Sequence, residues 1–176
     1  MSHGDQGDTY FNAKVRVQKI DQLQQAIDKI KSKPTDRRII VSAWNPAEIQ
    51  NMALPPCHSF FQFFVGKDRR LSLQMYQRSV DTMLGLPFNI ASYALLLEMV
   101  AAVTGCTADR LIMSLGDTHL YSDHLEGARL QLQREPMNPP KIWLNPEIKR
   151  LEDFTMDDIR LDEYESHNPI KLKMAV

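Results

Sequence analysis

The chain has 176 residues, of which 43% are hydrophobic and 24% are charged, and its formal net charge is −1. A chain of this length fits one domain with a substantial core. The net charge is too close to zero to give a general attraction to nucleic acid or to an anionic membrane, so we expect neither as a partner.

The first part of the chain predicts a helix and a strand behind a leading segment. We expect residues 1–18 to form a poorly ordered or divergent N-terminal segment, because the first residues are small and polar. Apolar side chains recur at helical spacing across residues 20–30, which predicts an amphipathic helix that ends before Pro34. Residues 38–44 (RIIVSAW) are rich in β-branched side chains and predict a buried strand.

The middle of the chain predicts a hairpin and a core helix. Residues 59–65 (SFFQFFV) and 71–79 (LSLQMYQRS) predict two strands joined by the polar loop 66–70. The segment 84–89 (LGLPFN) breaks this pattern. Residues 91–103 are apolar on almost every side, which predicts a helix buried in the core, and we find no apolar run of transmembrane length.

The last part of the chain predicts shorter elements. They are a strand at 110–115, a polar helix at 122–133, and strands at 141–144 and 159–164. This order of elements predicts an α+β fold with a mostly central sheet and one buried helix.

Cys57 stands in the run LPPCH (residues 54–58). Two prolines fix the backbone before it, so the thiol is presented from a stiff stretch of chain. A nucleophile and a small buried thiol both fit this setting. Cys106 is the other cysteine, and two cysteines make no disulfide framework. We therefore expect a reducing, cytoplasmic environment.

Polar clusters lie at the ends of other predicted strands. Arg37 and Arg38 begin one strand and suit a phosphate, although a solvated strand end gives the same pattern. Residues 76–81 (YQRSVD) end another strand with a cation, and cationic charge near a thiol favours its thiolate. His119 and Tyr121 share one side of an extended chain and suit a sugar hydroxyl, whereas His119 alone also fits a core histidine.

Several other chemistries fit the sequence poorly. The five histidines have no zinc-type spacing with the cysteines, so we expect no metal. The glycines form no phosphate-binding loop, and the sequence has no basic stripe with interleaved aromatic residues. A cysteine protease would need a base partner, which no pattern identifies.

Five stretches together resemble the thymidylate synthase family, from about residue 20 to the C-terminus. They follow the order and spacing of the family: RRIIVSAWNP (37–46), LPPCH (54–58), YQRSVD (76–81), LGLPFNIASYALL (84–96) and GDTHLYSDH (116–124). The resemblance implies a thymidylate synthase-like fold with a central mixed β-sheet, a buried central helix and a dimer formed through the sheet.

The resemblance also implies an enzyme, a methyltransferase that converts dUMP to dTMP with 5,10-methylenetetrahydrofolate as cosubstrate. Its implied catalytic residues are Cys57, Arg78 and Asn89. Cys57 would add to C6 of the uracil ring, so that C5 can attack the one-carbon unit. Asn89 would pair with uracil O4 and N3–H, because a carboxamide is both donor and acceptor. Arg78 would stand near the nucleophile.

The remaining implied roles concern the nucleotide and the folate. Arg78 and Ser79 would bind the phosphate within one subunit, while a homodimer would donate Arg37 and Arg38 to the phosphate site of the partner. The implied residues for the rest of the nucleotide are Gln77, which positions it, and His119 and Tyr121, which hold the 3′-hydroxyl. The implied folate residues are Asp81, which also stands beside the nucleotide, with Leu54, Gly85, Phe88 and Val176.

We expect residues 19–176 to form the catalytic domain without the family's N-terminal part, which carries a further phosphate-binding arginine and a proton-transfer glutamate. Two alternatives stay open because those groups have no counterpart in the sequence. One is a dUMP hydroxymethylase of the same family, in which water completes the reaction. The other is a catalytically impaired homologue that binds nucleotide or a partner.

Overall fold

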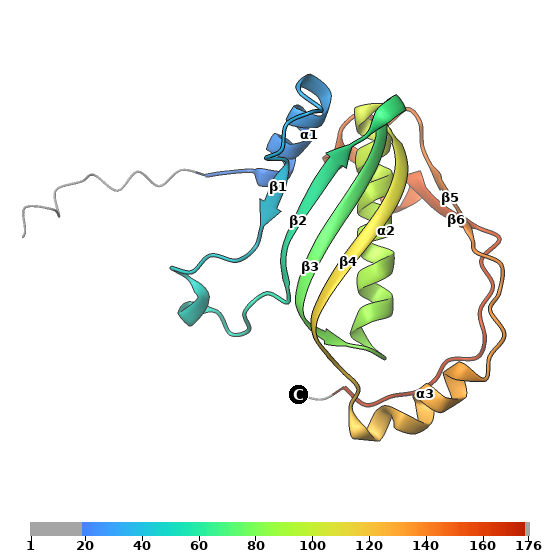
Figure 1. The fold of residues 1–176 in the computed structure, drawn as a ribbon. Helices are drawn as coiled ribbons and strands as arrows, with labels where there is room; N and C mark the ends of the chain where they lie inside the picture. Colours follow the sequence, from blue (N-terminus) through green and yellow to red (C-terminus); the bar gives the residue numbers. More distant parts are fainter. Residues whose placement is uncertain (1–18, 175–176) are drawn as a thin grey trace, which may run out of the picture.

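A four-stranded sheet forms the centre of the computed structural model, which describes residues 19–174 (Figure 1). Its strands, in spatial order, are β1 (Ile40–Ser42), β2 (His58–Val65), β3 (Arg70–Asp81) and β4 (Thr107–His119). The first three strands pair antiparallel, and β4 runs parallel to β3. The predicted α+β fold with a mixed central sheet is therefore confirmed. The predictions on residues 1–18 and on Val176 lie outside the described residues.

Helix α1 (Gln22–Ser32) forms where the apolar spacing predicts it. The Asp21 side chain accepts a hydrogen bond of 2.9 Å from the Gln24 backbone amide and so caps the first turn. The helix ends two residues before Pro34 and buries its apolar stripe in the core: Ala26, Ile27 and Ile30.

Helix α2 (Gly85–Thr104) connects β3 to β4 and begins earlier than predicted. The expected break at residues 84–89 is wrong, because Pro87 lies in the first turn, where a missing amide hydrogen costs no helical bond. At the other end, Gly105 adopts a left-handed φ of 64° and ends the helix. The Arg69 guanidinium donates to the carbonyls of Thr104 and Gly105 there, at 2.8 and 3.1 Å.

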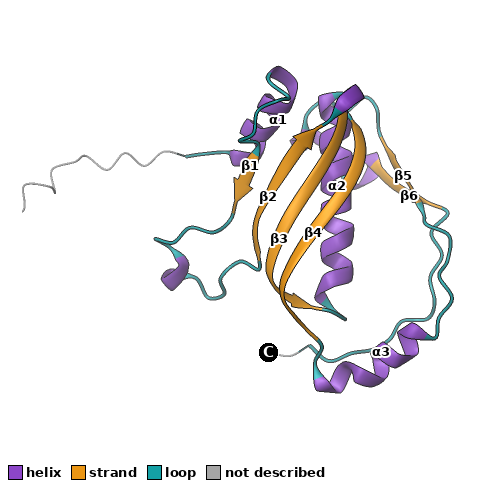
Figure 2. Cartoon of the chain, viewed as in Figure 1, coloured by secondary structure: helices purple, strands orange, loops and turns teal. Residues whose placement is uncertain are grey.

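One face of α2 packs on the sheet. Tyr93, Leu97, Val100 and Ala101 share the core with β3 and with α1 (Figure 2). Side chains in the first turns, Phe88 and Ile90 among them, are exposed within the described residues, so the expected burial holds for only part of the helix.

By length and composition alone α2 could cross a membrane, since it has 20 residues and a mean hydropathy of 1.6. The expectation of no apolar run of this length is therefore wrong. A core helix of a globular protein meets the same criterion, and Leu97 and Val100 of α2 pack against the sheet in this way. We take α2 as a core helix for that reason.

The two faces of the sheet differ in character. Alternate residues of β3 from Leu71 to Gln77 are buried toward α2. The other face carries large exposed apolar side chains from three strands: Phe60, Phe64, Tyr76 and Ile112. We call this surface the open apolar face, and it extends over β2, β3 and β4.

The C-terminal part of the chain forms an arm beside the sheet. It begins with the short 3-10 turn η4 (Ser122–His124) and helix α3 (Leu125–Leu132), and continues as the antiparallel pair β5 (Lys141–Leu144) and β6 (Ile159–Asp162). Figure 1 shows the end of the chain running alongside α3. The predicted helix 122–133 and the two predicted strands are confirmed, with β6 ending two residues early.

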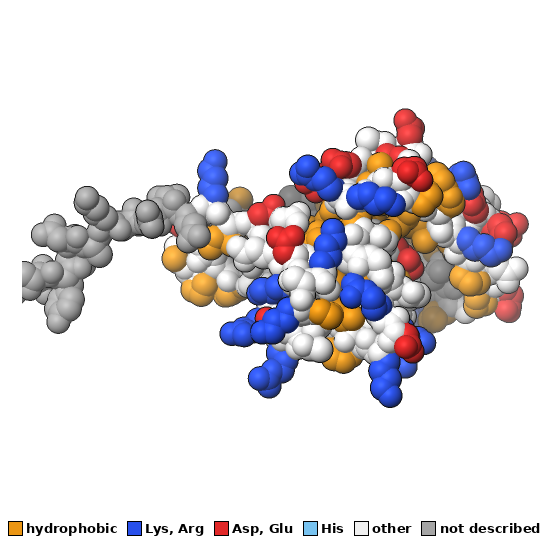
Figure 3. Space-filling model, turned by 90° about the horizontal axis from the view of Figure 1, so that it is seen from above, with side chains coloured by type: hydrophobic (Ala, Val, Ile, Leu, Met, Phe, Trp, Pro, Cys, Tyr) orange, Lys and Arg blue, Asp and Glu red, His pale blue; other side chains and the backbone are white. Residues whose placement is uncertain are grey.

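Two of the strand predictions have different bounds in the structure. β1 is shorter than the predicted strand 38–44, because its pairing with β2 is confined to three residues. β4 is much longer than the predicted strand 110–115 and contains residues 116–119 (GDTH), the start of the quoted GDTHLYSDH stretch. Figure 3 looks onto the end of the sheet that carries the β2–β3 turn, and there basic and acidic side chains are interspersed.

Candidate functional site

Most of the predicted site residues gather at one end of the sheet, where β3 and β4 finish. Cα pairing sets Ser79 opposite Asp117 and Asp81 opposite His119. On the other side of β3, Gln77 pairs with His58, the residue after Cys57. The strand order therefore brings the LPPCH, YQRSVD and GDTH motifs to a common edge.

The Cys57 loop is attached to β3 through the backbone, since the Arg78 amide donates to the Cys57 carbonyl at 2.9 Å. The thiol is half-buried and is not in a disulfide. It lines a cavity of about 540 Å³ between β1, β2 and the core helices, together with Gln22, Val41, Ser42, Ala43, Pro56, His58, Phe61 and Tyr93. A half-buried thiol beside an open cavity can meet a bound molecule.

Arg78 clamps the proline run before Cys57. Its Nε donates to the Pro56 carbonyl at 3.0 Å and its Nη2 to the Pro55 carbonyl at 2.8 Å. The guanidinium also lies 5.8 Å from the centre of the Trp44 ring, within reach of a cation–π contact. Hydrogen bonds from a charged group are the stronger kind, so this contact fixes the loop that presents the thiol.

Gln77 on β3 and Asn89 on α2 form a hydrogen-bonded pair, of which Gln77 is buried and Asn89 half-buried. Gln77 is only 3% exposed, and its Nε2 donates to Asn89 Oδ1 at 2.8 Å and to the Ser79 carbonyl at 3.0 Å. Gln77 Oε1 is one of two buried side-chain polar atoms without a partner in the described part of the chain. The bond to Gln77 orients the Asn89 carboxamide and leaves its Nδ2 as an outward donor.

Asp81 holds the turn that leads into α2. Its Oδ1 accepts hydrogen bonds from the backbone amides of Met83 and Leu84, at 3.0 and 3.1 Å. A methyl group on Gly85 would lie 3.4 Å from Asp81 and 3.7 Å from Asn89 Oδ1, which places all three residues side by side. One side chain thus links the end of β3 to the helix that carries Asn89.

His119 and Tyr121 lie together at the end of β4. Their rings meet edge to face with centroids 5.2 Å apart. The His119 carbonyl accepts from the Thr82 amide at 3.1 Å and from the Thr82 hydroxyl at 2.7 Å, which fastens this end of β4 to the end of β3. Cα pairing sets His119 opposite Asp81, and the ring contact places Tyr121 next to His119.

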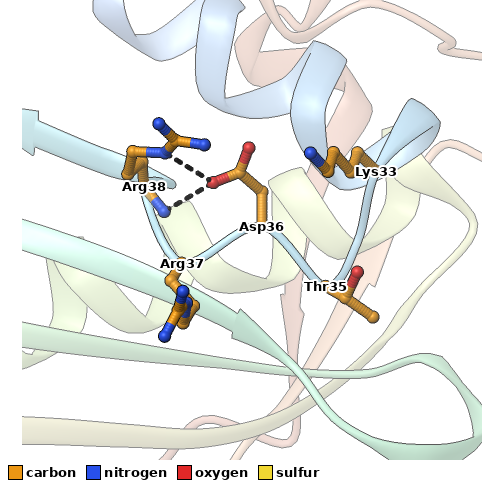
Figure 4. A pocket seen from close by; sticks show the side chains of 5 residues that line it. All are labelled: Lys33, Thr35, Asp36, Arg37 and Arg38. Atoms are coloured by element: carbon orange, nitrogen blue, oxygen red, sulfur yellow. Dashed lines mark hydrogen bonds and ion pairs between the residues drawn. The ribbon is translucent and has the colours of Figure 1, made fainter.

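Arg37 and Arg38 lie at the opposite end of the sheet from Cys57. Ser42 pairs with Phe60 near the Cys57 end, whereas Ile40 pairs with Gln62 further along β2, and the arginines precede Ile40. They line an open hollow of about 610 Å³ together with Lys33, Thr35 and Asp36 (Figure 4). Within one chain the structure does not bring these arginines to the Cys57 cavity.

The two arginines point in different directions (Figure 4). Asp36 accepts from the Arg38 backbone amide at 2.8 Å and from Arg38 Nε at 3.4 Å. These contacts with Arg38, the backbone bond foremost, hold the pKa of Asp36 below its ordinary value. Arg37 points away from this ion pair, so its guanidinium is not held by Asp36.

Leu54 and Phe88, the two large apolar side chains expected around a folate, are 75% and 73% exposed. Leu54 lies in the loop before Cys57, and Phe88 lies beside Asn89 on α2. Both flank the end of the sheet where the polar side chains gather. No set of three His, Cys, Asp or Glu side chains within residues 19–174 is grouped to hold a metal ion.

Sequence reasoning missed several residues that the structure adds to this end of the sheet. Tyr93 and His58 line the Cys57 cavity with rings 5.2 Å apart, and burial raises the pKa of the Tyr93 phenol. Trp44 packs on Arg78. Trp44 falls inside the quoted RRIIVSAWNP stretch, and Tyr93 inside LGLPFNIASYALL, but their contacts are formed in space and have no signal in local spacing.

The comparisons with known proteins point in one direction. The family model described as thymidylate synthase matches residues 2–176. A thymidylate synthase of Mycoplasma mobile is 52% identical over 174 residues, which cover 99% of this chain. The chain spans about 60% of the length of that relative.

Proposed function

Since the chain belongs to the thymidylate synthase family, we propose that it acts as a methyltransferase that converts dUMP to dTMP. The cosubstrate would be 5,10-methylenetetrahydrofolate, which supplies the carbon and the hydride. The observation that supports this proposal best is the Gln77–Asn89 pair beside the clamped Cys57 loop. Neighbouring residues of β3 thus hold the two groups, since Gln77 bonds the Asn89 carboxamide and Arg78 holds the loop of the Cys57 thiol. This arrangement suits a reaction on a ring that offers both a carbonyl and an N–H.

Cys57 would act as the nucleophile toward C6 of the uracil ring. Addition of the thiolate to C6 moves electron density to C5 and O4, so C5 becomes the carbon that attacks the one-carbon unit. Asn89 Nδ2 would donate to O4, where this negative charge develops, and its Oδ1 would accept from N3–H. Arg78 would keep the thiol in position through the Pro55 and Pro56 carbonyls.

The nucleotide would extend from Cys57 along the ends of β3 and β4. Arg78 and Ser79 would bind its phosphate within the subunit, with Gln77 positioning the base and His119 and Tyr121 holding the 3′-hydroxyl. Asp81, Leu54, Gly85 and Phe88 would lie on the folate side. The exposure of Leu54 and Phe88 supports this assignment, because a planar pterin ring needs apolar surface to pack on.

We also propose a homodimer formed through the open apolar face of the sheet, with Arg37 and Arg38 reaching the phosphate site of the partner. Exposed Phe60, Phe64 and Tyr76 support this interface, because an apolar face of this kind marks an interaction site. The separation of the arginines from Cys57 within one chain supports their donation to a second subunit. A cytoplasmic location fits Cys57 and Cys106, which are both free thiols.

Trapping with 5-fluoro-dUMP and methylenetetrahydrofolate tests the proposal, with an intact mass as the readout. Fluorine at C5 blocks proton loss, so a competent site should retain a covalent ternary adduct on Cys57. Cys57→Ser should abolish the adduct, and Cys106→Ser should leave it intact. Absence of the adduct from the unmodified chain, together with no nucleotide-dependent thermal shift, would contradict activity of this chain. Product analysis with dUMP separates dTMP from 5-hydroxymethyl-dUMP.

A further inference from the structure

His124 is the most deeply buried titratable side chain in the C-terminal part, at 1% exposure. Its Nε2 lies 2.7 Å from the Lys173 carbonyl. A carbonyl only accepts, so Nε2 must carry the hydrogen and donate it. Nδ1 is buried and has no hydrogen-bond partner within the described residues. Within the described residues, the hydrogen bond of this ring therefore goes to the C-terminal segment.

Gly127 provides a second contact with the same segment. A methyl group at Gly127 would lie 2.7 Å from Leu172 Cδ2, closer than side chains come without a shift, and 3.1 Å from Ile170 Cγ2, which is a tight contact. Further along, Arg134 Nη2 donates to the Asn168 carbonyl at 2.6 Å. Residues 168–173 are thus docked along η4 and α3 at several points, and His124 is the innermost.

The other side of the His124 ring faces the nucleotide end of the sheet. Its centroid lies 5.5 Å from that of Tyr121 in an edge-to-face contact, and Tyr121 makes the same kind of contact with His119 at 5.2 Å. Three rings therefore form a continuous row from the end of β4 to the Lys173 carbonyl. Edge-to-face pairs have preferred geometries, so fixing one ring narrows the positions of the next.

We propose that His124 is a positioning residue that couples nucleotide bound at His119 and Tyr121 to the docking of residues 168–174. The proposal rests on the proposed function, because it takes dUMP as the ligand of His119 and Tyr121. A nucleotide that fixes these two rings also fixes His124 and so favours its bond to Lys173. Since coupling between two sites is reciprocal, a docked C-terminal segment strengthens the binding of dUMP.

Hydrogen exchange of the full chain, read by mass spectrometry, tests the docking without ligand. In His124→Leu the amides of residues 168–174 should exchange about three- to tenfold faster, as expected for the loss of one net hydrogen bond. His124→Gln keeps a donor and should restore most of the protection. Leu172→Ala should also speed exchange there, whereas Leu132→Ala, on the exposed side of α3, should not. Equal exchange in all variants would overturn the docking role.

Saturating dUMP then tests the coupling. In the unmodified chain dUMP should slow exchange at residues 116–122 and also at 168–174. In His124→Leu, dUMP should slow exchange only at residues 116–122. A C-terminal response that is absent from the unmodified chain, or that persists in His124→Leu, would overturn the coupling. If His124→Leu does not fold by circular dichroism, Leu172→Ala makes the same comparison from the other side of the contact.

The same experiment distinguishes a failure of the proposed function from a failure of the docking role of His124. If dUMP slows exchange at neither segment, the proposed function fails and the coupling fails with it. The exchange rates without ligand still decide whether His124 docks the C-terminal segment.

Discussion

Gln77 donates a hydrogen bond of 2.8 Å to Asn89 Oδ1, and this bond joins the end of β3 to the first turns of α2. Gln77 occupies one of the two acceptor positions of Oδ1, so the second stays available to an N–H of the ligand and Nδ2 is left as the donor. An asparagine without such a bond could present either its oxygen or its nitrogen to a ligand, whereas the bond from Gln77 fixes the orientation of the Asn89 amide. The preference for a ring with a carbonyl at position 4 would therefore be set by Gln77 as much as by Asn89.

Gln77→Glu should weaken dUMP binding about 10- to 100-fold, the cost of leaving one or two buried polar groups unpaired. The new carboxylate would repel Asn89 Oδ1 and turn the amide, so that an acceptor faces uracil O4. Titration calorimetry with dUMP and dCMP measures the effect, and the preference for dUMP should fall. Gln133→Glu, at an exposed position after α3 and away from the sheet face proposed for the dimer, is the control. Unchanged affinity for dUMP in Gln77→Glu would contradict the orienting role.

Replacing Arg78 by lysine should slow adduct formation with 5-fluoro-dUMP about 10- to 100-fold, because lysine keeps the charge but not the fork that reaches two carbonyls. Arg78→Ala should form the adduct at least as slowly as Arg78→Lys. A time course of intact masses gives the rates, and Cys106→Ser gives the reference for an undisturbed loop. Wild-type rates in Arg78→Lys would show that charge alone matters and that the bonds to Pro55 and Pro56 do not.

Two inactive variants should recover activity when mixed. A chain with both Arg37 and Arg38 changed to alanine keeps Cys57, and Cys57→Ser keeps both arginines. Random exchange of subunits gives one complete site in half of the dimers, so activity should return to about one quarter of wild type. Refolding the mixture from denaturant and assaying dTMP formation measures the recovery. If the arginine variant is active by itself, or if mixing restores nothing, donation across the interface is ruled out.

Gly116→Ala should destabilise the fold by about 1–3 kcal/mol, the usual cost of forcing atoms into a packed site. A methyl group there would lie 2.7 Å from the Arg78 carbonyl oxygen and 3.1 Å from the Tyr76 hydroxyl, so β4 would have to move away from β3. Urea denaturation gives the free energy of unfolding. Gly66→Ala is the matched control, because its methyl would meet neighbours only at 3.6 Å. Equal stability of the two variants would refute the close approach at Gly116.

Glu98 should make stability depend on pH. Burial in α2 raises the pKa of its carboxyl group above the ordinary value. Between the ordinary and the raised value the native state binds more protons than the unfolded state, so the free energy of unfolding falls as pH rises through that window. Glu98→Gln should therefore be more stable than wild type at neutral pH and lose this advantage on acidification below the ordinary pKa.

Thermal unfolding across this pH range measures the Glu98 effect. Glu147→Gln, at an exposed position, serves as the control and should follow the wild-type curve. A Glu98→Gln advantage that does not shrink on acidification would place its cause in packing and not in proton binding.

The elements that could be predicted are those whose signal is local. The spacing from Ile20 to Ile30 and the β-branched and aromatic runs around Phe60 gave α1 and β2 close to their observed bounds. The start of α2 differs from the prediction, which treats residues 84–89 as a break, whereas a proline in the first turn fits a helix. The sequence also showed that α2 is apolar, but not which of its faces the sheet covers.

The site could be predicted in part for the same reason. Motif order marked Cys57, Gln77 and Asn89, and the strand pairing does bring their segments to one end of the sheet. The roles of these residues stay predictions until they are tested. His124 stood inside a quoted motif without a role, because its contact with Lys173 spans 49 residues and depends on how the chain returns past α3.

The parallel pairing of β3 with β4 also sets an order in which the site is completed during folding. Gln77 and Asn89 are 12 residues apart and can meet as soon as α2 folds back on β3. The pairing of Asp81 with His119 closes the whole crossover and costs more chain entropy, so we expect it to form later. A chain halted before that step would hold its carboxamide ready for a base while the side chains for the sugar were still absent.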